Sequence, residues 1–217
     1  GQGDCFVADT KSGAIIFDGG SSSEDQVGRY RILPYMKYLG YQKIQIAVIS
    51  HMDIDHYSGI KELLEMGKIK YLGLPEIPKD ETMKKIIGIA KKRGTTIFYL
   101  SRGRQITTKD GSLKVLHPQK NSQMEKNAAS LVMQGKILGY RVLLTGDVEK
   151  EGEEELLSEE LERADILKAA HHGSKNSTSN EFLQKVQPKQ TVISKPSVSI
   201  CQNFCSTPLQ TNRRRVT

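Results

Sequence analysis

Two clusters of residues in the sequence carry the side-chain types that bind metal ions. Four of the five histidines fall in them, and the first cluster is Ser50-His51-Met52-Asp53-Ile54-Asp55-His56. It places two imidazoles and two carboxylates within six residues, and both are ligand types for divalent metals. His51 and Asp53 could hold one ion, and Asp55 and His56 a second one close by. A polar surface loop with chance charges is the alternative, but it does not explain why all four residues directly follow an apolar run.

The second cluster is Ala169-Ala170-His171-His172-Gly173-Ser174, again after an apolar run. One of the two histidines could be a metal ligand while the other orients a partner, and the sequence leaves open which is which. Adjacent histidines can also simply end a strand. Two further motifs, Asp18-Gly19-Gly20 and Thr145-Gly146-Asp147, are typical of ordinary turns when each is taken alone.

Each of these motifs follows a segment that predicts a strand. In a loop that follows a strand, alternate residues can converge on one point, as the pairs in the first cluster could. Apolar runs predict strands over residues 5–8, 14–17, 44–49, 69–74, 95–100, 112–116, 129–134, 141–145, 166–170 and 190–194. Helical spacing of apolar residues predicts helices over residues 26–39, 58–66, 81–93, 150–161 and 181–186. This order predicts an α/β sandwich of two sheets with helices outside.

Taken together and in order, the motifs resemble the metallo-β-lactamase superfamily. The resemblance covers residues 1–194 and implies a four-layer αβ/βα sandwich with metal ions between the sheets. Some features are more particular: Gly1-Gln2-Gly3-Asp4, an Asp at position 53 where many members have His, Asn127 three residues before Ser130, and the 171–174 segment. These resemble the soluble hydrolase domain of ComEC-type competence proteins, which take up DNA, and its free-standing relatives.

The resemblance implies two divalent ions and assigns roles to particular residues. Asp147 would bridge the ions, Asp18 would support the ligands, and Asn127 would bind metal or substrate. Asp53, Asp55 and Ser174 are the candidate catalytic residues: either Asp could relay a proton if it is not fully engaged as a ligand, and Ser174 could bind substrate oxygens. The implied metal ligands are His51, Asp53, Asp55, His56, Asp147, His171 and His172.

Two departures from the superfamily pattern affect this interpretation. Members usually supply a His ligand between the first cluster and the bridging Asp, but here that interval holds only His117, which precedes Pro118 and is predicted to lie in a loop. An oxygen-rich site shifts the preference from Zn²⁺ toward Mn²⁺ or Mg²⁺, with zinc retained as a candidate. The ComEC-type relatives also carry a Gly-His-Pro segment near the C-terminus, where this chain has Ser206-Thr207-Pro208 without a His. The role of that His is then lost or supplied otherwise.

The first functional hypothesis is a phosphodiesterase or nuclease acting on DNA in competence-type uptake. The net charge of +7 and the pI near 9.2 fit a polyanionic partner such as single- or double-stranded DNA. The second is a hydrolase of a small lactone, β-lactam or phosphorylcholine ester, because a fold does not fix a substrate. The third is a non-catalytic module that binds DNA.

Composition and length narrow the class of protein. With 217 residues, 37% hydrophobic and 26% charged, the chain is of globular type, and no apolar run is long enough for a membrane span. Three cysteines make no disulfide framework, so free thiols are expected. Residues 195–217 predict an irregular basic tail. The abrupt start suggests an excised domain or a missing natural start, so the cytoplasm and the cell-surface side of a membrane protein both stay open as locations.

Overall fold

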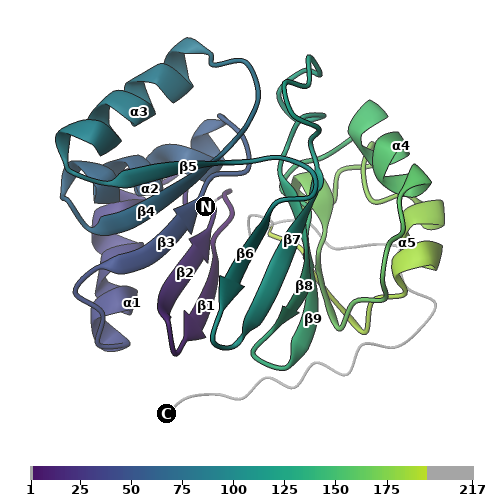
Figure 1. Ribbon diagram of the computed structural model, residues 1–217, viewed down its shortest axis with the longest axis horizontal. Coiled ribbons are helices and arrows are strands. Elements are labelled where there is room, and N and C mark those ends of the chain that lie inside the picture. The colour runs from purple at the N-terminus through teal and green to yellow at the C-terminus, as the bar shows by residue number, and fades with distance from the viewer. Residues whose placement is uncertain (1, 195–217) are drawn as a thin grey trace.

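The structure is a computed structural model, and it describes residues 2–194 of the chain. Within that range, two β-sheets face each other (Figure 1). In the first sheet, β1 and β2 form an antiparallel hairpin, and β3, β4 and β5 follow β2 in parallel. Its strands lie in chain order: β1 (Phe6–Thr10), β2 (Gly13–Phe17), β3 (Ile44–Val48), β4 (Ile69–Pro75) and β5 (Thr96–Leu100).

The second sheet has the order β11-β10-β9-β8-β7-β6. Neighbours from β6 to β9 are antiparallel, whereas β9, β10 and β11 are parallel. Its strands are β6 (Gln105–Thr108), β7 (Gly111–His117), β8 (Val132–Ile137), β9 (Tyr140–Leu144), β10 (Ile166–Lys168) and β11 (Gln190–Val192).

Alternating side chains along the strands build three apolar cores. On β2, Ala14 and Ile16 face the helices of the first sheet, whereas Ile15 and Phe17 enter the core between the sheets. On β9, Leu143 faces the helices of the second sheet. The helices therefore cover both outer faces, as Figure 1 shows: α1 (Leu33–Tyr38), α2 (Ile54–Glu65) and α3 (Glu81–Lys92) on one, α4 (Glu151–Ser158) and α5 (Asn180–Val186) on the other. The predicted four-layer αβ/βα sandwich is confirmed.

Several element boundaries differ from the sequence prediction. The helix predicted over residues 58–66 begins at Ile54, so Asp55 and His56 lie in the first turn of α2 and not in a loop. The helix predicted over residues 26–39 is a π-helical turn, Gly28–Ile32, followed by the short α1. Strand β8 begins at Val132 instead of residue 129. Strand β6 was not predicted, because its sequence is mostly polar and buries one apolar side chain, Ile106.

The predicted irregular tail, residues 195–217, lies outside the described residues, as do Cys201 and Cys205. Cys5 is a free thiol. Between residues 2 and 194, every helix is too short or too polar to span a membrane.

Candidate metal centre

The four predicted motifs meet where strands of the two facing sheets end. Parallel neighbours in a sheet end at the same edge, so β2 and β3 bring Asp18 beside the first His/Asp cluster. In the other sheet, β9 and β10 do the same for Asp147 and the second His cluster. A backbone hydrogen bond from Leu131 N to Ser50 O (3.0 Å) joins the two edges. The structure thus brings together the four motifs on which the resemblance rests.

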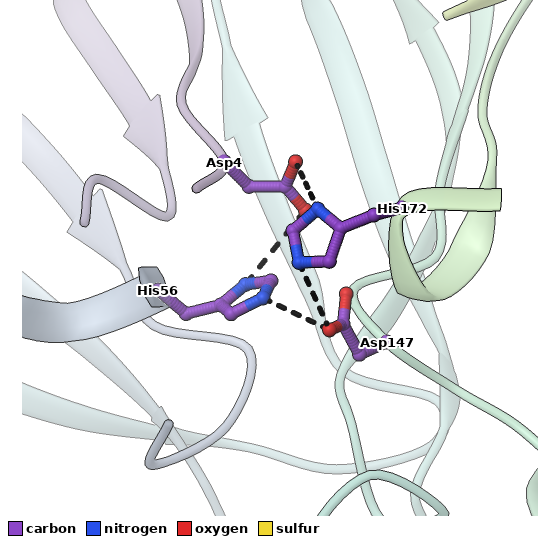
Figure 2. Close-up of side chains that lie close together, drawn as sticks. All are labelled: Asp4, His56, Asp147 and His172. Atoms are coloured by element: carbon purple, nitrogen blue, oxygen red, sulfur yellow. Dashed lines mark ion pairs between the residues drawn. The ribbon is translucent and has the colours of Figure 1, made fainter. Parts of the chain in front are cut away.

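Four buried residues form the tightest group among residues 2–194. Asp4, His56, Asp147 and His172 each offer one ligand-type atom, and these atoms lie within 4.8 Å of one another (Figure 2). The Asp147 carboxylate oxygen Oδ2 is 3.1 Å from His56 Nε2 and 3.4 Å from His172 Nε2. Asp55 Oδ2 lies 3.1 Å from the same His172 nitrogen. Side chains from both sheets thus face one small volume.

His51 and Asp53 lie immediately beside this group. The His51 and His56 ring centroids are 4.2 Å apart, and His51 Nε2 is 3.6 Å from Asp53 Oδ2. Asp53 is the most exposed of these groups, with 35% of its side chain accessible. The exposed ammonium of Lys126 lies 3.8 Å from its other oxygen. One side of the site is therefore open to solvent.

Two buried imidazole nitrogens suit a metal ion. His51 Nε2 and His56 Nε2 have no hydrogen-bond partner within residues 2–194, although their rings are almost inaccessible to water. A buried polar atom without a partner is costly. Both nitrogens face carboxylate oxygens, and imidazole with carboxylate is the donor set of many divalent metal sites. The residues present therefore fit the divalent metal ions that the sequence predicted.

Asp18 orients His56. Asp18 Oδ2 accepts a hydrogen bond from His56 Nδ1 (2.9 Å) and one from Ser50 Oγ (2.7 Å), while Oδ1 accepts from Ser50 N (2.7 Å). A proton on Nδ1 leaves the lone pair on Nε2, which faces Asp147. The backbone of Asp18 is left-handed, with φ of 57°. Next to it, a Cβ on Gly20 would lie 2.5 Å from Ile54 O, so glycine permits this segment to approach α2.

Replacing Asp18 with Asn is expected to weaken metal binding about ten- to hundredfold. The Asn amide can still accept from Ser50 N, but its NH₂ group would face the His56 Nδ1 proton, so the ring must move that proton to Nε2. Titration of the metal-free variant with Zn²⁺ against a chromophoric chelator measures the change. Asp25→Asn, an exposed carboxylate, is the control. An unchanged affinity in Asp18→Asn would show that Asp18 does not set the His56 tautomer.

Lys168 places a cation among these acids. Its side chain is 8% exposed and pairs with Asp4, with Asp147 Oδ1 (3.2 Å) and with Gly146 O (2.5 Å). Burial favours the neutral amine, but Asp4 and Asp147 outweigh it and raise the pKa of Lys168 above its usual value. Lys168 is thus a fixed positive charge.

The carboxylates also determine the charge of the histidines. Burial alone would lower the pKa of His56, yet Asp18 and Asp147 overcome it and raise that pKa to about 10, so a bound cation would have to displace the proton from Nε2 while Asp18 keeps the one on Nδ1. Burial likewise opposes the charge on Asp147, but His56 and Lys168 hold its pKa well below the usual range. The site therefore collects anionic oxygens around imidazoles, an arrangement that attracts cations.

The two adjacent histidines point to different partners. His172 faces Asp55 and Asp147, whereas His171 Nδ1 lies 2.9 Å from Glu149 Oε2. Both have left-handed backbones, with φ of 45° and 53°, in a short turn over Ala170–Gly173. Such strained conformations in non-glycine residues cluster at functional sites. The turn sends the two rings in different directions.

Other predicted residues lie around the centre. Ser174 Oγ accepts a hydrogen bond from Asn176 N (3.3 Å), within its own turn. Asn127 O accepts one from Ser130 N (3.0 Å). His117 was predicted to lie in a loop, but it is the last residue of β7, fully buried, with Nε2 2.7 Å from Ala128 O. Neighbouring segments cover both Leu116 and His117, and the strand extends as far as His117.

Sequence reasoning missed Asp4, Glu149 and Lys168 as parts of the site. Asp4 stood in a motif that carried the resemblance but received no role. Lys168 was visible as a lysine inside an otherwise apolar strand segment, which is an unusual place for a charge. Glu149 follows Asp147 by two residues and gave no comparable signal.

The fold and the site together define a class of protein. Two facing mixed sheets with outer helices, and a His/Asp centre at the strand ends between them, match the metallo-β-lactamase design. The family model of the metallo-beta-lactamase superfamily matches residues 1–194. The chain belongs to this superfamily, whose members are generally metallo-hydrolases.

Similar proteins include a ComE operon protein and a competence protein. The chain is 36% identical over 213 residues to ComE operon protein 3 of Bacillus subtilis, covering 89% of this chain and 27% of that protein. It is 28% identical over 204 residues to competence protein ComA of Neisseria gonorrhoeae, covering 89% and 26%. It thus spans about a quarter of the length of these relatives.

A solved structure with the same fold is human tRNase Z, short form. It has a TM-score of 0.51 at 13% identity, and the match covers 88% of this chain and 85% of that one. At this identity the likeness concerns the fold.

Proposed function

We propose that this chain is a metal-dependent phosphodiesterase that cleaves DNA, as part of competence-type uptake. The carrying observation is a pair of buried imidazole nitrogens that face carboxylates between the two sheets and find no hydrogen-bond partner in the described part of the chain. The competence relatives and the net charge of +7 favour DNA over a small uncharged substrate.

The proposed ligands divide into two sets that share Asp147. His51 and Asp53 would hold one ion. Asp55, His56 and His172 would hold the other. His172 is preferred to His171 because its Nε2 atom faces the shared carboxylate, while His171 is paired with Glu149. This mixed set of imidazoles and carboxylates suits Mn²⁺ or Zn²⁺, with Mg²⁺ as a further candidate.

Two divalent ions at such a site lower the pKa of a water molecule and neutralise charge on a phosphoryl oxygen. The protein's own residues would orient the reaction. Asp53, at the open side with 35% of its side chain accessible, can accept a proton from attacking water with a carboxylate oxygen that the ion leaves free. The exposed ammonium of Lys126 beside it can attract a phosphodiester. Ser174 and Asn127 remain candidates for contacts with substrate oxygens.

The test is metal content measured together with DNA cleavage. The purified chain is expected to bind two ions and to cut single- or double-stranded DNA with Mn²⁺, Zn²⁺ or Mg²⁺, and cleavage should vanish in Asp55→Ala. Two bound ions with no cleavage, but turnover of a lactone, β-lactam or phosphorylcholine ester, would instead identify a small-molecule hydrolase. DNA binding without bound metal would point to a non-catalytic module.

A further inference from the structure

Lys168 is a buried ammonium at the centre of the site that the chemistry above does not use. It is the last residue of β10, beside Leu144 of β9. Burying a charge is costly unless it is paired. Here the cost is offset by two carboxylates, Asp4 and Asp147, and by the Gly146 carbonyl. An ammonium that contacts three partners in this way holds those partners in place.

The contact divides the two oxygens of Asp147. Oδ1 accepts a hydrogen bond from Lys168 Nζ at 3.2 Å. Oδ2 lies 3.1 Å from His56 Nε2 and 3.4 Å from His172 Nε2. A free carboxylate can offer both oxygens to metal ions. Because Lys168 occupies Oδ1, Asp147 offers only Oδ2 to metal ions.

Asp4 and Asp147 lie on opposite sides of the two imidazoles, as Figure 2 shows. The Asp4 oxygens are 3.8 Å from His56 Nδ1 and 3.7 Å from His172 Nδ1, whereas Asp147 faces the Nε2 atoms. His56 Nδ1 already donates to Asp18. An ion held at the two Nε2 atoms would lie nearer to Asp147 than to Asp4, and Asp4 contacts the Lys168 ammonium. Asp4 therefore serves Lys168 as its counter-ion.

We propose that Lys168, held by Asp4, is a positioning residue that fixes Asp147 so that Oδ2 alone is offered to the metal ions. The proposal rests on the dinuclear site of the proposed function. Lys168 can affect metal affinity in two ways that have opposite signs. As a charge, Lys168 repels metal cations, so removing it should tighten metal binding. As a positioning group, it aligns a ligand, so removing it should weaken metal binding.

The experiment compares Lys168→Met and Lys168→Gln with the unaltered chain. Zn²⁺ affinity is measured by competition with a chromophoric chelator, and the visible spectrum of the Co²⁺ form reports ligand geometry. Lys168→Met is expected to lose about ten- to hundredfold in affinity and to change the Co²⁺ spectrum. Lys168→Gln is equally uncharged but keeps a donor for Asp147, so its loss should be smaller. Lys189→Met removes an exposed lysine that pairs with Asp165 of the same sheet, and should change nothing.

The outcomes separate this proposal from the function on which it rests. If the unaltered chain binds no metal, the proposed function fails and the role of Lys168 with it. If the unaltered chain binds two ions, and Lys168→Met binds them as tightly or more tightly with the same spectrum, the function stands and the positioning role is overturned. Melting curves of the metal-free proteins identify variants that do not fold. Should Lys168→Met be one, Lys168→Leu takes its place, because it too lacks both the charge and the donor, and affinity equal to or above that of the unaltered chain would contradict the proposal.

Discussion

Asp147→Asn is expected to lower the rate of DNA cleavage about a thousandfold and to reduce bound metal below two ions per chain. Asp147 is the carboxylate that faces both His56 and His172, and it is the residue that both proposed ligand sets share. The amide is neutral and presents a poorer ligand. Losing several kcal/mol of charge stabilisation by the metals corresponds to about three powers of ten in rate.

Single-turnover cleavage with saturating Mn²⁺, together with metal analysis of the same samples, measures both effects. Asp165→Asn is the matched control, because Asp165 belongs to the same half of the fold and pairs with Arg141 and Lys189 away from the site. Cleavage by Asp147→Asn within tenfold of the unaltered rate would remove Asp147 from the proposed centre.

Removing metal is expected to lower the melting temperature by about 8–16 °C. Without bound cations, the site holds four buried or half-buried carboxylates close together, those of Asp4, Asp18, Asp55 and Asp147. Lys168 and the histidines then balance their charge. Metal at about a thousand times its Kd stabilises a folded chain by about 4 kcal/mol. For a domain of this size, each kcal/mol shifts the melting temperature by roughly 2–4 °C.

Thermal melts before and after chelation, and after metal is added back, check this. The drop should reverse on adding metal and should be much smaller in Asp147→Asn, which starts with less metal to lose. A melting temperature that does not respond to chelation in the unaltered chain would mean that no ion contributes to its folded state.

The layered fold could be predicted because its strands have strong and simple patterns. The apolar run at residues 44–49 became β3, and the helical spacing over residues 81–93 became α3 almost without change. Prediction failed where polar residues interrupt the pattern. Strand β6 buries only Ile106, and the first turn of α2 carries Asp55 and His56 facing the site instead of a core. At the start of α2, the residues that face the site interrupt the apolar spacing from which a helix is predicted.

The site could be predicted as far as its motifs are local. His51, Asp53, Asp55 and His56 lie in one run, so their spacing alone indicated metal chemistry. Asp4 and Lys168 could not be assigned in this way, because their roles depend on a contact between distant parts of the chain. The choice between His171 and His172 depends on two left-handed backbone conformations, which no sequence pattern specifies.

The contact between His172 and Asp55 joins residues 117 positions apart in the chain. Closing so long a loop is entropically costly and slow, and the strands that precede these residues, β3 and β10, belong to separate sheets. During synthesis, the first ligands would leave the ribosome long before the last, and a complete centre cannot assemble until both sheets have docked. Metal capture at the proposed centre would thereby be tied to the final stage of folding, so that half-made chains would carry no reactive centre.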